Sequence, residues 1–158
     1  MSEAVSVSVE SGVAWRAFIE TSARLHTDLD DELRRDAGLT LADYSILVQL
    51  SEADGQRLRM RDLAARMAFS SSRLSYQIDS MVKRGWLTRE RVSSDRRGSY
   101  AALTPLGRSA FRKAAVGHLA CVQRMFFDRI DDDDAADLLR IMTKLSAAES
   151  TSTKRESP

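Results

Sequence analysis

Between residues 70 and 84 the sequence carries a run of basic and polar side chains that suit the surface of duplex nucleic acid. Arg73, Lys83 and Arg84 can bind phosphate oxygens, and an arginine can also form a bidentate pair with the edge of guanine. Hydroxyl and amide groups that bond phosphates or base edges stand among them, at Ser70, Ser71, Ser72, Ser75, Tyr76 and Gln77. The chemistry of this stretch favours DNA binding, although Tyr76 and Gln77 could also be surface side chains without a function.

The apolar residues between these polar ones predict that a helix presents them. Leu74, Ile78, Met81 and Val82 recur at i, i+4, i+7 and i+8, which is the spacing of one buried helical stripe. Gly85 follows, where a helix commonly ends in a left-handed residue. The same spacing predicts a shorter helix just before, at Leu63, Ala64 and Met67.

A charged hairpin is predicted after these two helices. Two extended runs, 86–92 and 99–103, flank a tip that contains Asp95, Arg96 and Arg97. Two helices followed by such a hairpin make up a winged helix-turn-helix. The recognition helix would enter the major groove, and Arg97 and Arg96 would lie in or beside the minor groove. Asp95 would orient Arg97 rather than bind DNA.

Charge is segregated along the chain, although the formal net charge is only +1. Residues 1–56 hold four Lys/Arg and eleven Asp/Glu, whereas residues 57–97 hold eleven Lys/Arg and four Asp/Glu. Residues 98–127 add four basic side chains and no acidic one, and residues 128–149 are again acidic. A basic middle between acidic ends is the electrostatic pattern expected of a DNA-binding module.

Composition indicates a globular cytoplasmic protein without enzymatic machinery. The 158 residues are 43% hydrophobic, with no apolar run long enough to span a membrane and no secretory pattern at the start. The single cysteine, Cys121, excludes an internal disulfide and fits a reducing compartment. We find no Ser-His-Asp set, Gly-rich phosphate loop or metal triad, so we expect neither an enzyme nor a cofactor.

The predicted fold is mainly α with a small antiparallel β wing. We expect a disordered N-terminal tail (1–12), a dimerisation helix (13–39), the winged helix-turn-helix (40–104), C-terminal dimerisation helices (105–147) and a disordered C-terminal tail (148–158). The long outer helices carry apolar stripes that predict a homodimer. Two-fold symmetry would place two recognition helices about 34–36 Å apart, on a palindromic operator.

The chain resembles the MarR family of winged helix-turn-helix transcriptional regulators over about residues 13–147. The most specific segments are Asp79–Leu87, Asp95–Arg97 and Leu103–Gly107. The resemblance implies that the family's recognition-helix positions fall on 70–73 and 75–77, and its wing arginines on Arg96 and Arg97. Family members often have Thr-Arg where this chain has Ser75-Tyr76, so base preference does not transfer.

The resemblance also implies control by a small molecule. In the family, phenolic or aromatic acids bind between the dimer helices and the DNA module and release a repressor. Residues that join an aromatic surface to a polar tip are the candidates for such a pocket: Trp15, His26, Tyr44 and His118. Each could instead be a core or dimer-interface residue.

Four alternatives to this interpretation need to be considered. Cys121 could act as a redox sensor, although its apolar neighbours favour a buried, inert thiol. His118 and Cys121 have metal-compatible spacing but lack further ligands, so we expect no metal. The winged helix could also be a dimerisation or protein-interaction module that does not bind DNA. Activation rather than repression cannot be told from the sequence.

Overall fold

The computed structural model describes the backbone of residues 7–92 and 95–152, and the side chains of residues 7–91 and 98–147. The chain divides into two units, residues 1–121 and 122–158. The helices of the first unit and the start of the second are α1 (Val9–Ala37), α2 (Leu41–Ser51), α3 (Met60–Met67), α4 (Ser71–Lys83) and α5 (Pro105–Met125). The strands are β1 (Arg57–Arg59), β2 (Leu87–Val92) and β3 (Asp95–Leu103), and helix α6 (Asp132–Ser152) follows in the second unit. Short 3-10 turns occupy Asp54–Gln56 and Phe127–Arg129.

Local capping chemistry sets several of the helix ends. Thr40 and Asp43 form a reciprocal capping box at the start of α2. Thr104 precedes Pro105, and its hydroxyl accepts from the backbone N–H of Gly107 at 3.0 Å. Gly85 has a φ of 75°, the left-handed conformation predicted for the residue that follows α4.

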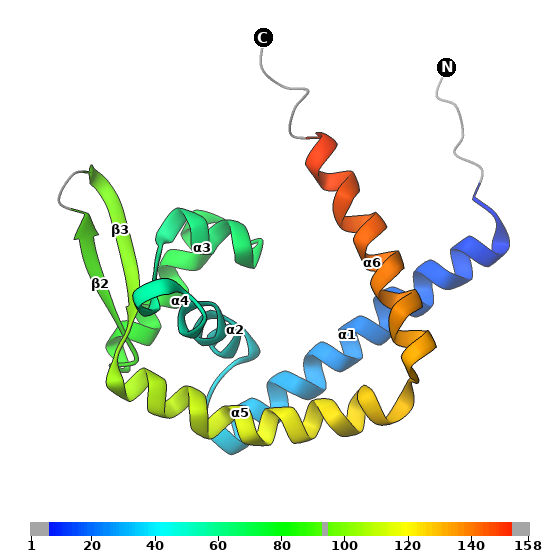
Figure 1. The fold of residues 1–158 in the computed structure, drawn as a ribbon, viewed down its shortest axis with the longest axis horizontal. Coiled ribbons are helices and arrows are strands. Elements are labelled where there is room, and N and C mark those ends of the chain that lie inside the picture. Colours follow the sequence, from blue (N-terminus) through cyan, green and yellow to red (C-terminus); the bar gives the residue numbers. More distant parts are fainter. Residues whose placement is uncertain (1–6, 93–94, 153–158) are drawn as a thin grey trace, which may run out of the picture. The chain divides into compact units, whose positions relative to one another are not determined.

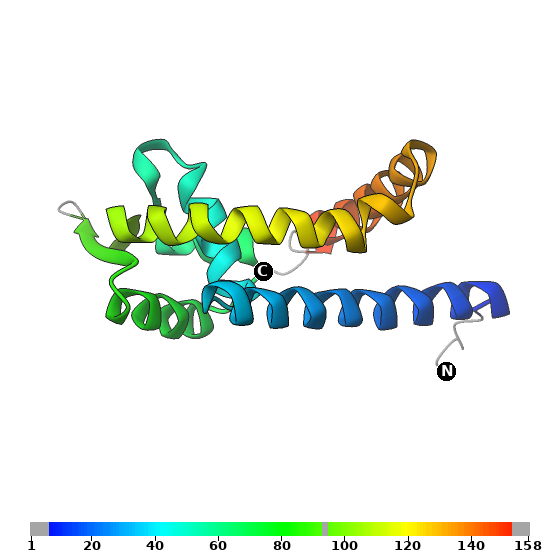
Figure 2. The same ribbon diagram turned by 90° about the horizontal axis from the view of Figure 1, so that it is seen from below.

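The predicted tails overlap the helices. Helix α1 begins at Val9, four residues before the predicted boundary, because the Ser8 side chain accepts from the backbone N–H of Ser11 and caps it. Helix α6 continues to Ser152, beyond the predicted end at 147. Helix α1 is therefore an uninterrupted helix of 29 residues (Figure 2).

The sheet has three antiparallel strands in the order β1-β3-β2, and β1 was not predicted. It is only three residues long, and Leu58 pairs with Ala101 in β3, far away in sequence. Strand β3 also begins at Asp95, so residues that we predicted in the hairpin tip belong to a strand. The pairing shifts register between Arg91 and Val92, so the ladder is irregular at this point.

The core of the first unit lies where α2, α3 and α4 gather beside the sheet (Figure 1). Leu74, Ile78 and Met81 have at most 1% of their surface exposed, which confirms the predicted stripe of α4. Leu63 and Ala64 of α3 are buried with them. Several polar residues of α4, Ser72, Tyr76 and Lys83 among them, are exposed on the side away from this apolar support. No helix in the described residues is long and apolar enough to cross a membrane.

Candidate nucleic-acid interface

The outward face of α4 is polar and open to solvent. Ser72, Tyr76 and Lys83 are exposed, and at about 3.6 residues per turn they project from the side opposite the buried stripe. Tyr76 is 79% exposed. A large aromatic side chain without cover on a helix that packs well elsewhere is a candidate for contact with a partner. The face predicted from the sequence is therefore presented to solvent.

The N-terminus of α4 adds free backbone donors to this face. Ser70 caps the helix, its Oγ accepting from the N–H of Arg73 at 3.3 Å, and also lies 3.2 Å from the Oγ of Ser72. Ser71 and Ser72 are exposed in the first turn, where no acidic residue occurs. Unpaired N–H groups and the helix dipole favour an anion such as a phosphate at this end.

Arg73 is exposed, but its guanidinium is oriented by a neighbouring ring. Its guanidinium carbon lies 4.1 Å from the centroid of the Phe69 ring. A planar guanidinium stacked on an aromatic ring is pre-oriented and keeps its N–H groups available at the edge. This geometry suits a phosphate or base contact beside the N-terminus of α4.

The wing is tied to α4 by an arginine that our sequence analysis did not single out. Arg89 of β2 pairs with Asp79 at 3.2 Å and donates to the Oγ of Ser75 at 3.3 Å. The pair offsets the negative charge of Asp79 on a face that would meet phosphates. Ser75, predicted to contact DNA, instead accepts from the wing. The sequence did contain a signal for Arg89, because it is one of the basic residues of the 57–97 segment.

The base of the wing carries further basic residues. The guanidinium carbons of Arg57 and Arg59 lie 5.1 and 5.5 Å from the centroid of the Tyr100 ring, and Arg57 also pairs with Glu90 at 3.4 Å. The predicted wing residues Asp95, Arg96 and Arg97 belong to the backbone of β3, and their side chains lie outside the described residues.

Two of the predicted DNA contacts are instead bonded within the protein. Gln77 donates to Asp43 Oδ1 at 2.6 Å, and Arg84 donates to the carbonyl of Gly38 at 2.6 Å. The Arg84 guanidinium also lies 3.5 Å from the ring centroid of Trp86. The structure thus separates an exposed set (Ser71, Ser72, Arg73, Tyr76, Lys83) from two residues that bond within the protein, the half-buried Gln77 and Arg84, whose side chain is still 40% exposed.

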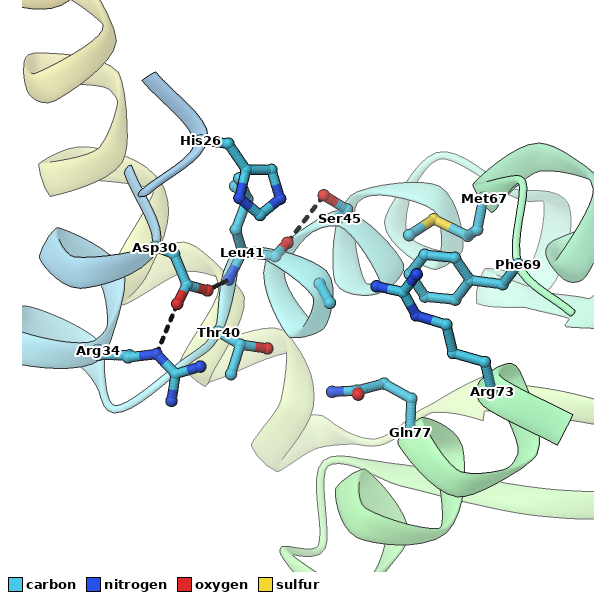
Figure 3. A pocket seen from close by; sticks show the side chains of 11 residues that line it. His26, Asp30, Arg34, Thr40, Leu41, Ser45, Met67, Phe69, Arg73 and Gln77 are labelled. Atoms are coloured by element: carbon cyan, nitrogen blue, oxygen red, sulfur yellow. Dashed lines mark hydrogen bonds and ion pairs between the residues drawn. The ribbon is translucent and has the colours of Figure 1, made fainter. Parts of the chain in front are cut away.

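A cavity of about 400 Å³ lies between α1, α2 and the α3–α4 segment (Figure 3). Met67, Phe69 and Arg73 line one side of it, and His26 and Arg34 line the other. Its remaining lining residues are Asp30, Thr40, Leu41, Ala42, Ser45 and Gln77. The cavity combines an aromatic ring, a thioether and two arginines, which suits a small organic anion.

One carboxylate in this cavity is held by its neighbours. Asp30 accepts from Arg34 Nε at 2.6 Å and from the backbone N–H of Leu41 at 2.7 Å, as the dashed lines of Figure 3 show. Burial raises the pKa of Asp30, but these two bonds and the charges of Arg34 and His26 outweigh it and leave the pKa below its usual value. Asp30 is thus an anion that forms an ion pair with Arg34. Arg73 also lines the cavity, and no carboxylate among the described residues pairs with it.

The four residues predicted to line a ligand pocket do not share a site. Only His26 lines the cavity. Tyr44 and His118 lie together, with ring centroids 4.3 Å apart, and Trp15 is 63% exposed beside Phe18 on α1. Within one chain the four residues lie on three different elements, and a pocket that includes all of them stays a prediction.

Tyr44 and His118 occupy the junction of α2 and α5. Burial raises the pKa of Tyr44. Burial also lowers the pKa of His118, against the Glu32 carboxylate, which raises it. Among the described residues, neither His118 Nδ1 nor Glu32 Oε2 has a hydrogen-bond partner. The junction is a half-buried contact between two aromatic side chains with polar tips.

Cys121 is 4% exposed on α5. Burial keeps the thiol away from oxidants and supports the inert role over redox sensing. The described residues contain no group of three or more His, Cys, Asp or Glu that could hold a metal ion.

The sequence and the fold resemble those of known regulators. A family model described as the MarR family matches residues 37–98. The structure of Sco3205 from Streptomyces coelicolor, a MarR family transcriptional regulator in complex with DNA, is 36% identical and covers 90% of each chain with a TM-score of 0.87. AbsC, a MarR family transcriptional regulator of the same organism, is 38% identical over 92% of this chain and 98% of its own, also with a TM-score of 0.87. The HTH-type transcriptional regulator YkoM of Bacillus subtilis is 26% identical over 125 residues, which is 77% of this chain and 79% of that protein.

Proposed function

The chain belongs to the MarR family of transcriptional regulators, and from this premise we propose that it binds a palindromic DNA operator as a cytoplasmic homodimer. The outward face of α4 would lie in the major groove and the wing beside the minor groove. The protein would act on transcription by occupying DNA and not as an enzyme. Repression is the form that we propose.

The single observation that carries this proposal is the exposed polar face of α4, whose opposite side packs on the apolar core. Ser72, Tyr76 and Lys83 project from the same side of α4. Arg73 is pre-oriented by the Phe69 ring, and the N-terminus of α4 lies at one end of this face. Buried Leu74, Ile78 and Met81 hold the helix against the core, so the face is rigid. A rigid convex helix with hydroxyl, phenol and cationic groups fits the width of the major groove.

Binding to duplexes selected from a random library tests the proposal. If the dimer makes six to ten phosphate contacts, affinity should fall by about 10³ to 10⁵ between 50 and 200 mM salt. Arg73→Ala and Arg97→Ala should each weaken operator binding by about 1–3 kcal/mol without loss of fold. Arg24→Ala, an exposed arginine of α1, is the matched control and should bind like wild type. A folded protein that binds no duplex at low salt would leave only the protein-interaction alternative.

We also propose that the cavity between α1, α2 and α4 takes a small aromatic or phenolic acid that releases the protein from DNA. The ring would pack on Phe69 and Met67, and the carboxylate would meet Arg73. Such a ligand acts only through a difference in its affinity for the free and DNA-bound conformations.

Salicylate is a suitable probe for this second proposal. We expect salicylate to dissociate the operator complex, and Ala42→Leu, which reduces the cavity volume, to abolish that response while leaving operator binding intact. Equal sensitivity of the variant and the wild type would place the effector site elsewhere.

A further inference from the structure

We infer that Asp43 is a positioning residue for DNA binding, which holds the recognition helix α4 to α2 through Gln77 and Arg84. The inference rests on the proposed function, because it assigns a role within DNA binding. It also reassigns Gln77 and Arg84, which the sequence predicts to touch DNA, to a role inside the protein.

Asp43 makes more contacts than its cap requires. A capping box needs one carboxylate oxygen, and here Oδ2 accepts from the backbone N–H of Thr40 at 3.0 Å. The other oxygen, Oδ1, accepts from Gln77 of α4 at 2.6 Å. Arg84 Nη1 lies 3.6 Å from Oδ2, and the residue as a whole is 2% exposed. A buried carboxylate is costly unless it is paired, and α4 supplies this additional pairing.

Arg84 joins four parts of the fold at the end of α4. Besides Asp43, it donates to the carbonyl of Gly38, where α1 ends, and stacks on Trp86, which precedes β2. Gly38 has a φ of 66°, so its carbonyl is presented by a left-handed turn. The guanidinium is therefore engaged by an acceptor, an anion and an aromatic face at once, and a phosphate would have to compete with all three.

The spacing of Gln77 and Arg84 along α4 explains why their bonds to Asp43 would matter for DNA recognition. Gln77 and Arg84 are seven residues apart, which is about two helical turns or about 10 Å along one flank of α4. Two points on a flank fix both the rotation of a helix about its axis and its tilt. The outward face with Ser72, Tyr76 and Lys83 lies on a different side, so a rotation would move every one of its groups relative to the groove.

The salt dependence of binding separates positioning from direct contact. Removing a phosphate contact lowers the slope of log Kobs against log salt by about 0.9, whereas misplacing α4 lowers affinity while leaving the number of neutralised phosphates unchanged. We expect Gln77→Ala and Arg84→Ala to weaken operator binding roughly ten- to a hundredfold, the range for losing a hydrogen bond to a charged group, with the wild-type slope. Lys83→Ala, the exposed neighbour, should instead reduce the slope by about 0.9 per subunit.

Double substitutions test whether Asp43 is the shared partner. Asp43→Ala combined with Gln77→Ala should bind about as weakly as Asp43→Ala alone, because Asp43→Ala already removes the bond that Gln77 makes. Asp43→Asn, which keeps one carbonyl oxygen, should fall between wild type and Asp43→Ala. Gln77→Ala leaves the cap of α2 intact, so it carries the test if Asp43→Ala does not fold.

The outcomes distinguish this inference from the function on which it rests. A wild-type protein that binds no duplex overturns the proposed function and this inference with it. The inference alone is overturned if the wild type binds and Gln77→Ala and Arg84→Ala bind with wild-type affinity. It is also overturned if these variants reduce the salt slope as Lys83→Ala does. The inference is supported if Gln77→Ala and Arg84→Ala weaken operator binding with the wild-type salt slope. It also requires that Gln77→Ala adds no further loss when it is combined with Asp43→Ala.

Discussion

Ile78 in the recognition helix has none of its surface exposed, whereas Leu139 in α6 exposes 69% and Leu145 exposes 54%. The same contrast occurs within α1, where Leu33 is 2% exposed and Trp15 is 63% exposed. The winged module covers its apolar residues with its own chain. The N-terminal half of α1 and the apolar side of α6 do not have such cover among the described residues.

The difference indicates which part of the molecule is complete by itself. The module satisfies the hydrophobic effect within one chain, so its fold does not require a partner. Long amphipathic helices that expose several large apolar side chains are typical of an association surface. The contrast supports the proposed homodimer, in which the outer helices would be covered by the second copy.

The largest expected effect concerns the module. Ile78→Ala should lower the free energy of unfolding by about 2–5 kcal/mol, because it leaves a cavity in a fully packed core. Tyr76→Ala, two positions away on the exposed face, should change stability by less than about 0.5 kcal/mol. Urea titration followed by circular dichroism measures both. Similar losses in the two variants would show that the module is not packed as described.

The next effect concerns the outer helices. Leu145→Asp on α6 should leave the module folded but weaken dimerisation by at least about 1.5 kcal/mol, the lower range for burying a leucine. Sedimentation equilibrium measures the dissociation constant. Arg140→Asp, exposed on the polar side of α6, is the control. A dimer that is unaffected by Leu145→Asp would exclude this face from the interface.

The smallest effect concerns His118, where α5 meets α2. Its pKa is lowered by burial, so the unfolded chain binds a proton more readily than the folded chain. Stability should therefore be full above the ordinary histidine pKa of about 6.5 and should decline as the pH falls below it. Urea unfolding of wild type and His118→Gln between about pH 7.5 and about pH 5 measures this difference, with a flatter profile expected for the variant. A wild type that gains stability on acidification relative to His118→Gln would mean that the attraction of Glu32 dominates.

Much of the local structure could be predicted because its causes are local. The α4 stripe depends on residues within two turns of one another, and it is confirmed. The Thr40–Asp43 capping box and the Thr104-Pro105 start have equally local causes. Strand β1 could not be predicted in this way. Three residues carry too little pattern, and Leu58 becomes a strand residue only by pairing with Ala101.

The sequence predicted which residue types make up the candidate site, but not which of their side chains point to solvent and which bond within the protein. The helix that carries it and the exposed residues Ser72, Arg73, Tyr76 and Lys83 follow from composition and period. The inward bonds of Gln77 do not, because its partner Asp43 is 34 positions away in sequence. For the same reason Arg89, which reaches α4 from β2, was not singled out.

By itself, the amino-acid sequence determined the helical elements, their capped ends, the buried stripe of α4 and the basic character of the middle segment, since these depend on neighbours along the chain. Only the tertiary structure decided which polar groups of α4 face solvent and which bond to Asp43, and that His26 lies apart from Tyr44 and His118. The physical reason is that a side chain's partner is set by which elements pack together, and packing joins residues that no local spacing relates.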